Sequence, residues 1–207
     1  MRFRVLNVDP LYDYREACKI TEGIDLWTAE TINEAHLPKV KDKTAWWIKQ
    51  ICANHSTLRV VHFRLVDIAP KSVIMQVIRA TKGHPQPEVQ SSRPDWNNGK
   101  ERSSDPYEVK LFMQDHTAES FVEMAKQRLC MRTEERTRNL MKEMVKTLRG
   151  SHDPFLQAVG YCCHPACEWL GNRCPEVKSC GKCRNISEHI INEYKFFDKA
   201  EETLERR

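Results

Sequence analysis

Alternation of apolar and polar side chains opens the chain and predicts a strand from Arg2 to Asn7. A second strand is predicted over Leu58 to Ile68, which is rich in Val, Phe and Leu and partly alternates. Apolar side chains spaced three and four residues apart instead predict amphipathic helices. These helices are expected at Thr44 to Asn54, Lys71 to Thr81, Ala118 to Arg149 and Ile186 to Arg207, with a weaker signal for a short helix at Tyr14 to Thr21.

Prolines and glycines divide these elements. Pro70 ends the second strand and suits the first turn of the next helix, and Gly150 is typical of a helix C-terminus. Residues 82–106 contain four prolines and two glycines, so we expect an irregular functional segment there. The pattern predicts the α+β class, with a mixed sheet flanked by long helices. We expect one domain over residues 1–150, a Cys-rich segment over 151–185 and a C-terminal helix over 186–207.

Composition fits a single globular domain. Of the 207 residues, 40% are hydrophobic and 30% are charged, which is ordinary for such a protein. The formal net charge of +4 suits an anionic small molecule as well as nucleic acid and decides between neither. No apolar run is long enough to cross a bilayer, and the first residues show no signal-peptide core. We therefore expect a cytoplasmic protein, of a bacterium or a virus-infected cell, with no membrane partner.

The cysteines are clustered. Six of the nine lie between Cys162 and Cys183, and clustered cysteines in a reducing compartment indicate metal rather than disulfides. Cys180 and Cys183 have the Cys-x-x-Cys spacing of a thiolate knuckle. The predicted zinc ligands are Cys167, Cys174, Cys180 and Cys183, with Cys163, His164 and Cys162 as alternates. An iron–sulfur cluster needs the same thiolates and is the less favoured alternative.

Several short motifs follow one another in an order that resembles a known family. They are Asn54-His55-Ser56, Phe63-Arg64-Leu65, Pro70, Gln76-Val77-Ile78-Arg79, Glu88 through Ser91-Ser92-Arg93, and Ser120-Phe121 through Arg128. In this order they are similar to the flavin-dependent thymidylate synthases over nearly the whole chain. The resemblance implies a methyltransferase that uses FAD, methylenetetrahydrofolate and NADPH to convert dUMP to dTMP. It also implies a homotetramer with active sites between subunits.

The resemblance assigns roles to particular residues. Arg128 is the expected catalytic residue, because a fixed cation beside the pyrimidine carbonyl would stabilise negative charge as C5 becomes nucleophilic. Two serines and a guanidinium at Ser91, Ser92 and Arg93 suit a phosphate dianion. Arg102, from a neighbouring subunit, is a second expected phosphate contact. The remaining expected substrate contacts are Gln76 and Arg132, and the expected cofactor contacts are His55, Arg79, Lys82, His84 and Glu88.

Arg128, Arg132 and Arg136 recur every four residues, so one continuous helix would align them as a stripe. A solvated basic face is the simpler interpretation of that stripe.

The chain also departs from the family signature. Ala80, Thr81 and Pro94 stand where the signature has His, Arg and Tyr, so we expect remodelled and weaker flavin contacts. These changes leave room for another pyrimidine such as dCMP, or for a hydroxymethyl product. Two alternatives of another class remain: a zinc-stabilised nucleic-acid-binding protein and a non-catalytic nucleotide-binding protein. The Cys-rich segment lacks the base-reading helix of a zinc finger, which disfavours nucleic acid.

Overall fold

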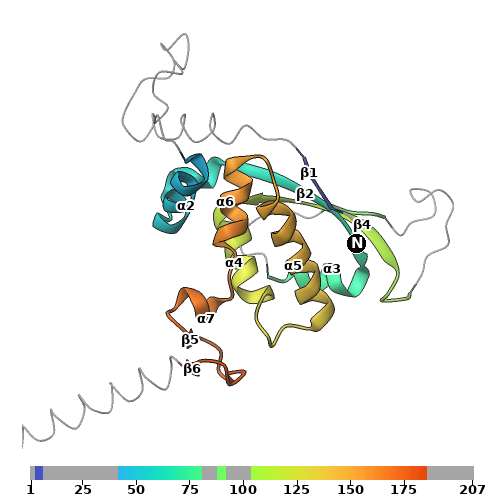
Figure 1. The fold of residues 1–207 in the computed structure, drawn as a ribbon. Helices are drawn as coiled ribbons and strands as arrows, with labels where there is room; N and C mark the ends of the chain where they lie inside the picture. The colour runs from blue at the N-terminus through green and yellow to red at the C-terminus, as the bar shows by residue number, and fades with distance from the viewer. Residues whose placement is uncertain (1–2, 7–41, 81–87, 92–103, 186–207) are drawn as a thin grey trace, which may run out of the picture.

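The computed structural model describes residues 3–6, 42–80, 88–91 and 104–185. The predicted helices at 14–21 and 186–207 lie outside these residues. The described part contains a four-stranded sheet with a group of helices on one side of it (Figure 1), which confirms the α+β class. Within that part, no helix is long and apolar enough to span a membrane.

The main sheet has the strand order β1-β2-β4-β3. Its strands are β1 (Phe3–Leu6), β2 (His62–Pro70), β4 (Val109–Thr117) and β3 (Glu88–Val89). Each described pairing in it is antiparallel, so the expectation of a mixed sheet is wrong for this sheet. The physical reason is that Pro70 pairs with Val109, so the chain leaves β2 and enters β4 at the same end of the sheet.

Strand β4 was not predicted, because its polarity pattern is inverted. Its buried face carries three polar residues, Lys110, Gln114 and His116, together with Phe112. Its other face exposes Val109 and Leu111. Apolar side chains facing outward and polar ones facing inward give no periodic signal of a half-buried strand.

The helices pack against the inner face of the sheet. They are α2 (Lys43–Ala53), the short 3₁₀ helix η2 (Ser56–Val60), α3 (Lys71–Ile78), α4 (Ala118–Arg128), α5 (Glu135–Arg149), α6 (Pro154–Cys162) and α7 (Ala166–Trp169). The predicted helices at 44–54 and 71–81 are confirmed within a few residues. The predicted strand at 58–68 begins later than expected, because its first residues form η2. A second, two-stranded parallel sheet joins β5 (Arg173–Cys174) to β6 (Arg184–Asn185).

The predicted helix from Ala118 to Arg149 is in fact two helices. Between them the Thr133 hydroxyl donates to the Gln127 carbonyl at 2.7 Å. One guanidinium nitrogen of Arg138 donates to the carbonyls of Met131 and Thr133 at 3.0 and 2.9 Å. The Glu134 carboxylate accepts from the Thr137 amide at 2.8 Å and so caps α5. These side-chain bonds compete with helical backbone bonds and stabilise the turn at residues 129–134.

Aromatic side chains hold the sheet and helices together. Phe63 of β2 makes edge-to-face contacts with Phe121 of α4 and Phe155 of α6, at ring-centroid distances of 5.5 and 6.2 Å. Trp47 of α2 contacts Phe155 in the same way at 5.0 Å. Such contacts add directional preference to the burial of apolar surface.

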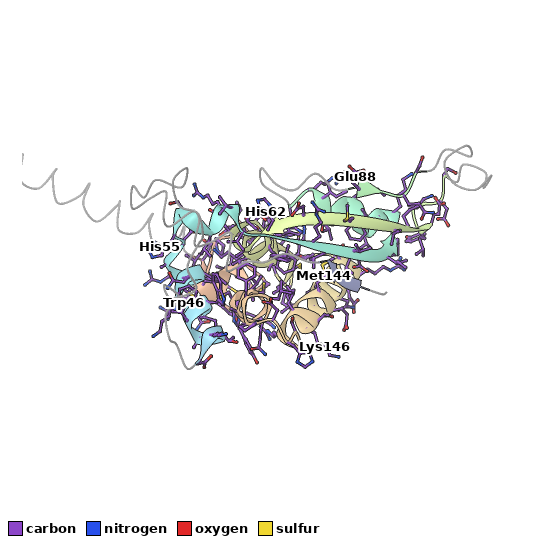
Figure 2. All side chains as sticks on the ribbon, turned by 90° about the horizontal axis from the view of Figure 1, so that it is seen from above. Trp46, His55, His62, Glu88, Met144 and Lys146 are labelled. Carbon is purple, nitrogen blue, oxygen red and sulfur yellow. The ribbon has the colours of Figure 1, made fainter. Side chains whose placement is uncertain are left out.

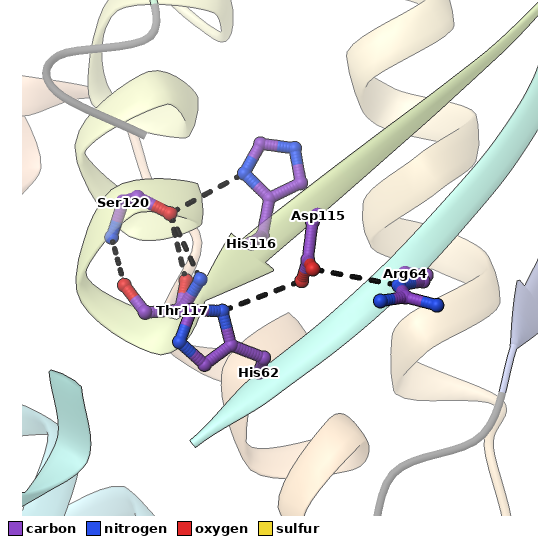
Figure 3. A network of polar contacts seen from close by, with 6 residues as sticks. All are labelled: His62, Arg64, Asp115, His116, Thr117 and Ser120. Carbon is purple, nitrogen blue, oxygen red and sulfur yellow. Dashed lines mark hydrogen bonds and ion pairs between the residues drawn. The ribbon is translucent and has the colours of Figure 1, made fainter. Parts of the chain in front are cut away.

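A histidine lies inside this aromatic core (Figure 3). His116 is fully buried, with its Nδ1 3.3 Å from the Ser120 hydroxyl and its Nε2 3.3 Å from the Gln114 Oε1. Burial lowers the pKa of His116 to about 3, so the imidazole is neutral at physiological pH. Ser120 and Thr117 also form the capping box that begins α4.

A buried carboxyl group lies on the same inner face of β2. Asp67 is 1% exposed; its Oδ1 accepts from the Ile68 amide at 2.6 Å, whereas its Oδ2 has no partner among the described residues. Burial raises the pKa of Asp67 from 3.8 to about 6. The folded chain therefore binds more protons than the unfolded chain between pH 3.8 and 6, and its stability falls as the pH rises through that window.

Replacing Asp67 by asparagine should therefore stabilise the protein at pH 7.5. We expect a gain of roughly 1–3 kcal/mol in the free energy of unfolding, shrinking toward zero at pH 4. Urea unfolding of both proteins at the two pH values measures it. Asp115→Asn is the control, since Asp115 is half-exposed and lies 3.4 Å from both His62 and Arg64 (Figure 3), and it should give no gain. Equal stabilities of wild type and Asp67→Asn at pH 7.5 would contradict the assignment.

Candidate functional site

Three of the predicted substrate residues line one cavity. Gln76 of α3, Arg128 at the end of α4 and Arg132 in the following turn border a space of about 790 Å³. Its opposite wall comes from the C-terminal segment and consists of Ala166, Trp169, Leu170, Pro175 and Glu176. This cavity, here called the arginine pocket, has the size of a small-ligand site.

Arg128 is held in an environment that favours an anion. Its Nε is buried and has no hydrogen-bond partner among the described residues. Burial, followed by the positive charge of nearby Arg79, lowers the pKa of Arg128 from its usual value. A buried donor without an acceptor and two cations held close together both cost free energy. A bound phosphate or a developing oxyanion would relieve both costs.

Two of the carboxylates that line the pocket already have partners. Glu123 pairs with Lys126 at 2.5 Å, and Glu134 is occupied by its hydrogen bonds to Thr137. Lys126 also lies over the Trp169 ring, 4.6 Å from its centroid. Within the described residues, neither Arg128 nor Arg132 has an ion-pair partner, although a third carboxylate, Glu176, also lines the pocket.

The predicted arginine stripe does not exist as one helical face. Arg128 ends α4, Arg132 lies in the turn, and Arg136 is in the first turn of α5 with its guanidinium 4.8 Å from the centroid of the Tyr107 ring. The break at residues 129–134 separates Arg136 from the other two. Arg128 and Arg132 nevertheless reach the same cavity.

The one predicted phosphate contact among the described residues does not line this pocket. Ser91 is half-buried just beyond β3 and is not among the residues that line the arginine pocket. Ser92, Arg93 and Arg102 lie outside the described residues.

The predicted flavin contacts do not form one slot in a single chain. His55 is exposed beside the end of α2, whereas Glu88 is exposed on edge strand β3, and the two lie far apart in Figure 2. Glu88 pairs with Met113, which lies opposite Val66 in the middle of β2, whereas His55 precedes the start of that strand. Arg79, at the end of α3, is the one described residue of this predicted set whose positive charge lowers the pKa of Arg128. Lys82 and His84 lie outside the described residues. Within the described residues of one chain, His55 and Glu88 therefore do not lie in one slot.

The predicted zinc ligands border a second cavity, of about 720 Å³. Cys167, Cys174, Cys180 and Cys183 all line it, and so does Cys130, which the sequence analysis did not single out. We name these five residues the thiol cluster. In the described part of the chain, no three His, Cys, Asp or Glu side chains are grouped closely enough to hold a metal ion as they stand.

The three alternate ligands have other partners. Both ring nitrogens of His164 are occupied, by the Glu168 carboxylate at 2.7 Å and the Tyr161 carbonyl at 2.8 Å. The Cys163 thiol donates to the Val159 carbonyl at 3.1 Å, and burial raises its pKa. Burial and contact with the Cys52 thiol raise the pKa of Cys162 to about 12. All three side chains therefore already have partners among the described residues.

No protein-family model matches the chain, and no curated protein matches its sequence.

Proposed function

We propose that the protein transfers a one-carbon unit from methylenetetrahydrofolate to C5 of a pyrimidine deoxynucleotide, converting dUMP to dTMP. The arginine pocket is the observation that carries this proposal. It joins Gln76, Arg128 and Arg132, with Arg79 beside them, in a cavity of small-ligand size with cations that lack counter-ions among the described residues. These four residues are among the twelve that the family resemblance assigns to the nucleotide and cofactor.

In this proposal the pocket binds and polarises the nucleotide. Arg128 donates to the pyrimidine carbonyl and stabilises the negative charge that develops as C5 becomes nucleophilic. Arg132, more exposed at the pocket rim, contacts the ligand's anionic group. Trp169 and Leu170 supply an apolar wall against which a planar base can lie.

FAD would supply the hydride that completes the methyl group, and NADPH would reduce FAD. Because the described residues of one chain do not form a flavin slot, we derive no step through the flavin. The proposed homotetramer would bring residues of another copy to the site. One feature supports such an assembly: among the described residues, the outer face of the sheet exposes the apolar side chains of Ile68, Val109 and Leu111. Exposed apolar patches of this kind often mark protein interfaces.

A non-catalytic nucleotide-binding protein is the second candidate. The separation of His55 from Glu88 favours it, because the arginine pocket can bind a nucleotide without any flavin nearby. Conversion of another pyrimidine, such as dCMP, or formation of a hydroxymethyl product remains an alternative within the first proposal.

A visible absorption spectrum, recorded while FAD is titrated with and without dUMP, tests the proposal. We expect a bound-flavin band that shifts when dUMP is added and does not shift with AMP, which has the same phosphate but a purine base. Binding of dUMP without any flavin band would instead support the non-catalytic alternative. Failure to bind either molecule would overturn both candidates.

A further inference from the structure

Two cysteines that are distant in sequence meet beside the C-terminal segment. The Cys167 side chain of α7 makes a hydrogen bond with the Cys183 side chain. Cys130 lines the same cavity as these two cysteines. Three thiols from three separate parts of the chain therefore lie together.

The turn that carries Cys180 and Cys183 has the shape of a metal-binding knuckle. The Ser179 hydroxyl accepts from the Gly181 amide at 3.1 Å and donates to the Cys183 carbonyl at 3.0 Å. Gly181 has a φ of +87°, which glycine adopts without strain. These hydrogen bonds and Gly181 shape a tight turn between Cys180 and Cys183, whose spacing is that of a zinc knuckle.

Cys130 lies at the boundary between the two cavities. It follows Arg128 by two residues and lines both the arginine pocket and the thiol-cluster cavity. Its carbonyl accepts from the Thr133 amide at 3.0 Å, so the turn at residues 129–134 holds its backbone. Cys174 lines the same cavity from β5, where it is buried, whereas Cys130 is the thiol that also reaches the arginine pocket.

We propose that Cys130, Cys167, Cys180 and Cys183 form a structural tetrathiolate zinc site that fastens the C-terminal segment to the end of α4. Because the described thiols do not yet surround one point, the ion has to draw them inward. The exposed turn with Cys180 is the part with room to move. Cys130 thereby replaces Cys174 in the ligand set expected from sequence spacing.

The zinc site would also shape the arginine pocket. The segment that it fastens carries Trp169, Leu170 and Pro175, which form the far wall of that pocket. This site does not depend on the proposed transferase activity, since a structural zinc ion contributes to folding whichever ligand the pocket binds.

Metal content and metal affinity of the full-length protein test this site. We expect one zinc ion per chain, and a cobalt-substituted protein with the absorption of a tetrahedral tetrathiolate. Cys130→Ser should weaken zinc binding by on the order of a hundredfold, because the binding free energy is shared among four ligands. Cys174→Ser should bind zinc as the wild type does. The matched control is Cys52→Ser, which removes an exposed thiol outside the cluster.

Three results would overturn the site: full zinc affinity in Cys130→Ser, loss of zinc in Cys174→Ser alone, or iron with sulfide in place of zinc. If Cys130→Ser does not fold, alkylation of the wild-type protein gives the answer. Zinc should protect Cys130 from iodoacetamide and leave Cys52 reactive, as read by mass spectrometry. Equal alkylation of Cys130 with and without zinc contradicts the proposal.

Discussion

Replacing Arg128 by glutamine should lower the rate of pyrimidine turnover roughly 10²- to 10³-fold, which is the usual cost of removing one preorganised donor from a developing oxyanion. The affinity for dUMP should fall as well, since the same guanidinium contacts the bound base. Steady-state kinetics and calorimetric titration with dUMP measure the two effects.

The same substitution should leave the fold at least as stable as before. The Arg128 Nε has no hydrogen-bond partner among the described residues, and both burial and nearby Arg79 disfavour its charge. Removing the guanidinium therefore relieves a cost in the unliganded protein. A large loss of turnover and dUMP affinity without a loss of stability is the pattern expected of a ligand-binding residue. Binding sites often hold side chains in arrangements that cost free energy of folding.

Two neighbouring arginines separate this effect from a general loss of charge. Arg136→Gln removes a guanidinium that lies over the Tyr107 ring and does not line the pocket, so turnover and dUMP affinity should change little. Arg138→Gln removes hydrogen bonds to Met131 and Thr133 that hold the turn, so stability should fall. If Arg128→Gln lowers stability as Arg138→Gln does, or leaves dUMP affinity unchanged, the role given to Arg128 is wrong.

The sequence predicted the elements whose apolar side chains follow a regular period. The α2 and α3 helices were found in this way, because each buries one face: Trp47 and Ile51 in α2, and Val73, Ile74 and Val77 in α3. The β4 strand was missed because its inward positions carry Lys110, Gln114 and His116. Lys110 is compensated by Glu108 at 2.6 Å and His116 by Gln114 and Ser120. Polar side chains at inward positions break the apolar alternation by which a half-buried strand is recognised in a sequence.

The break between α4 and α5 was missed for a related reason. Apolar residues continue at helical spacing on both sides of it, and the turn depends on side-chain hydrogen bonds from Thr133, Glu134 and Arg138. Any of these residues is also acceptable inside a helix. From periodicity alone, the two helices were therefore predicted as one, and Arg136 was placed on the same face as Arg128 and Arg132.

The site was predicted in part. The family resemblance named Gln76, Arg79, Arg128 and Arg132, and the structure places them around or beside one cavity. Spacing within the Cys-rich segment found four thiols of that cluster, whereas Cys130 was missed because it lies far upstream and close to no other cysteine in the sequence. Residues that converge through folding, rather than through spacing, are visible only in three dimensions.

The second large effect expected is on acid stability, and His116 is its source. The unfolded chain binds a proton at this histidine near pH 6.5, whereas burial lowers the pKa in the folded protein to about 3. Between these values the unfolded state holds more protons, so the free energy of unfolding falls as the pH falls. From pH 7 to pH 4.5 this one group should remove roughly 2–3 kcal/mol, a large share of the ~5–15 kcal/mol typical of a domain.

Replacing His116 by glutamine tests this, because glutamine keeps polar contacts toward Gln114 and Ser120 but does not titrate. We expect the variant to be less stable than wild type at pH 7, by about 1–3 kcal/mol, since the ring also fills space against Phe63 and Phe121. The difference should shrink or reverse at pH 4.5, as measured by urea unfolding. His62→Gln is the matched control, because it removes a half-exposed histidine at the start of β2 and leaves the buried His116 ring in place. A His116→Gln variant that loses stability with falling pH as steeply as wild type would show that another group drives the acid unfolding.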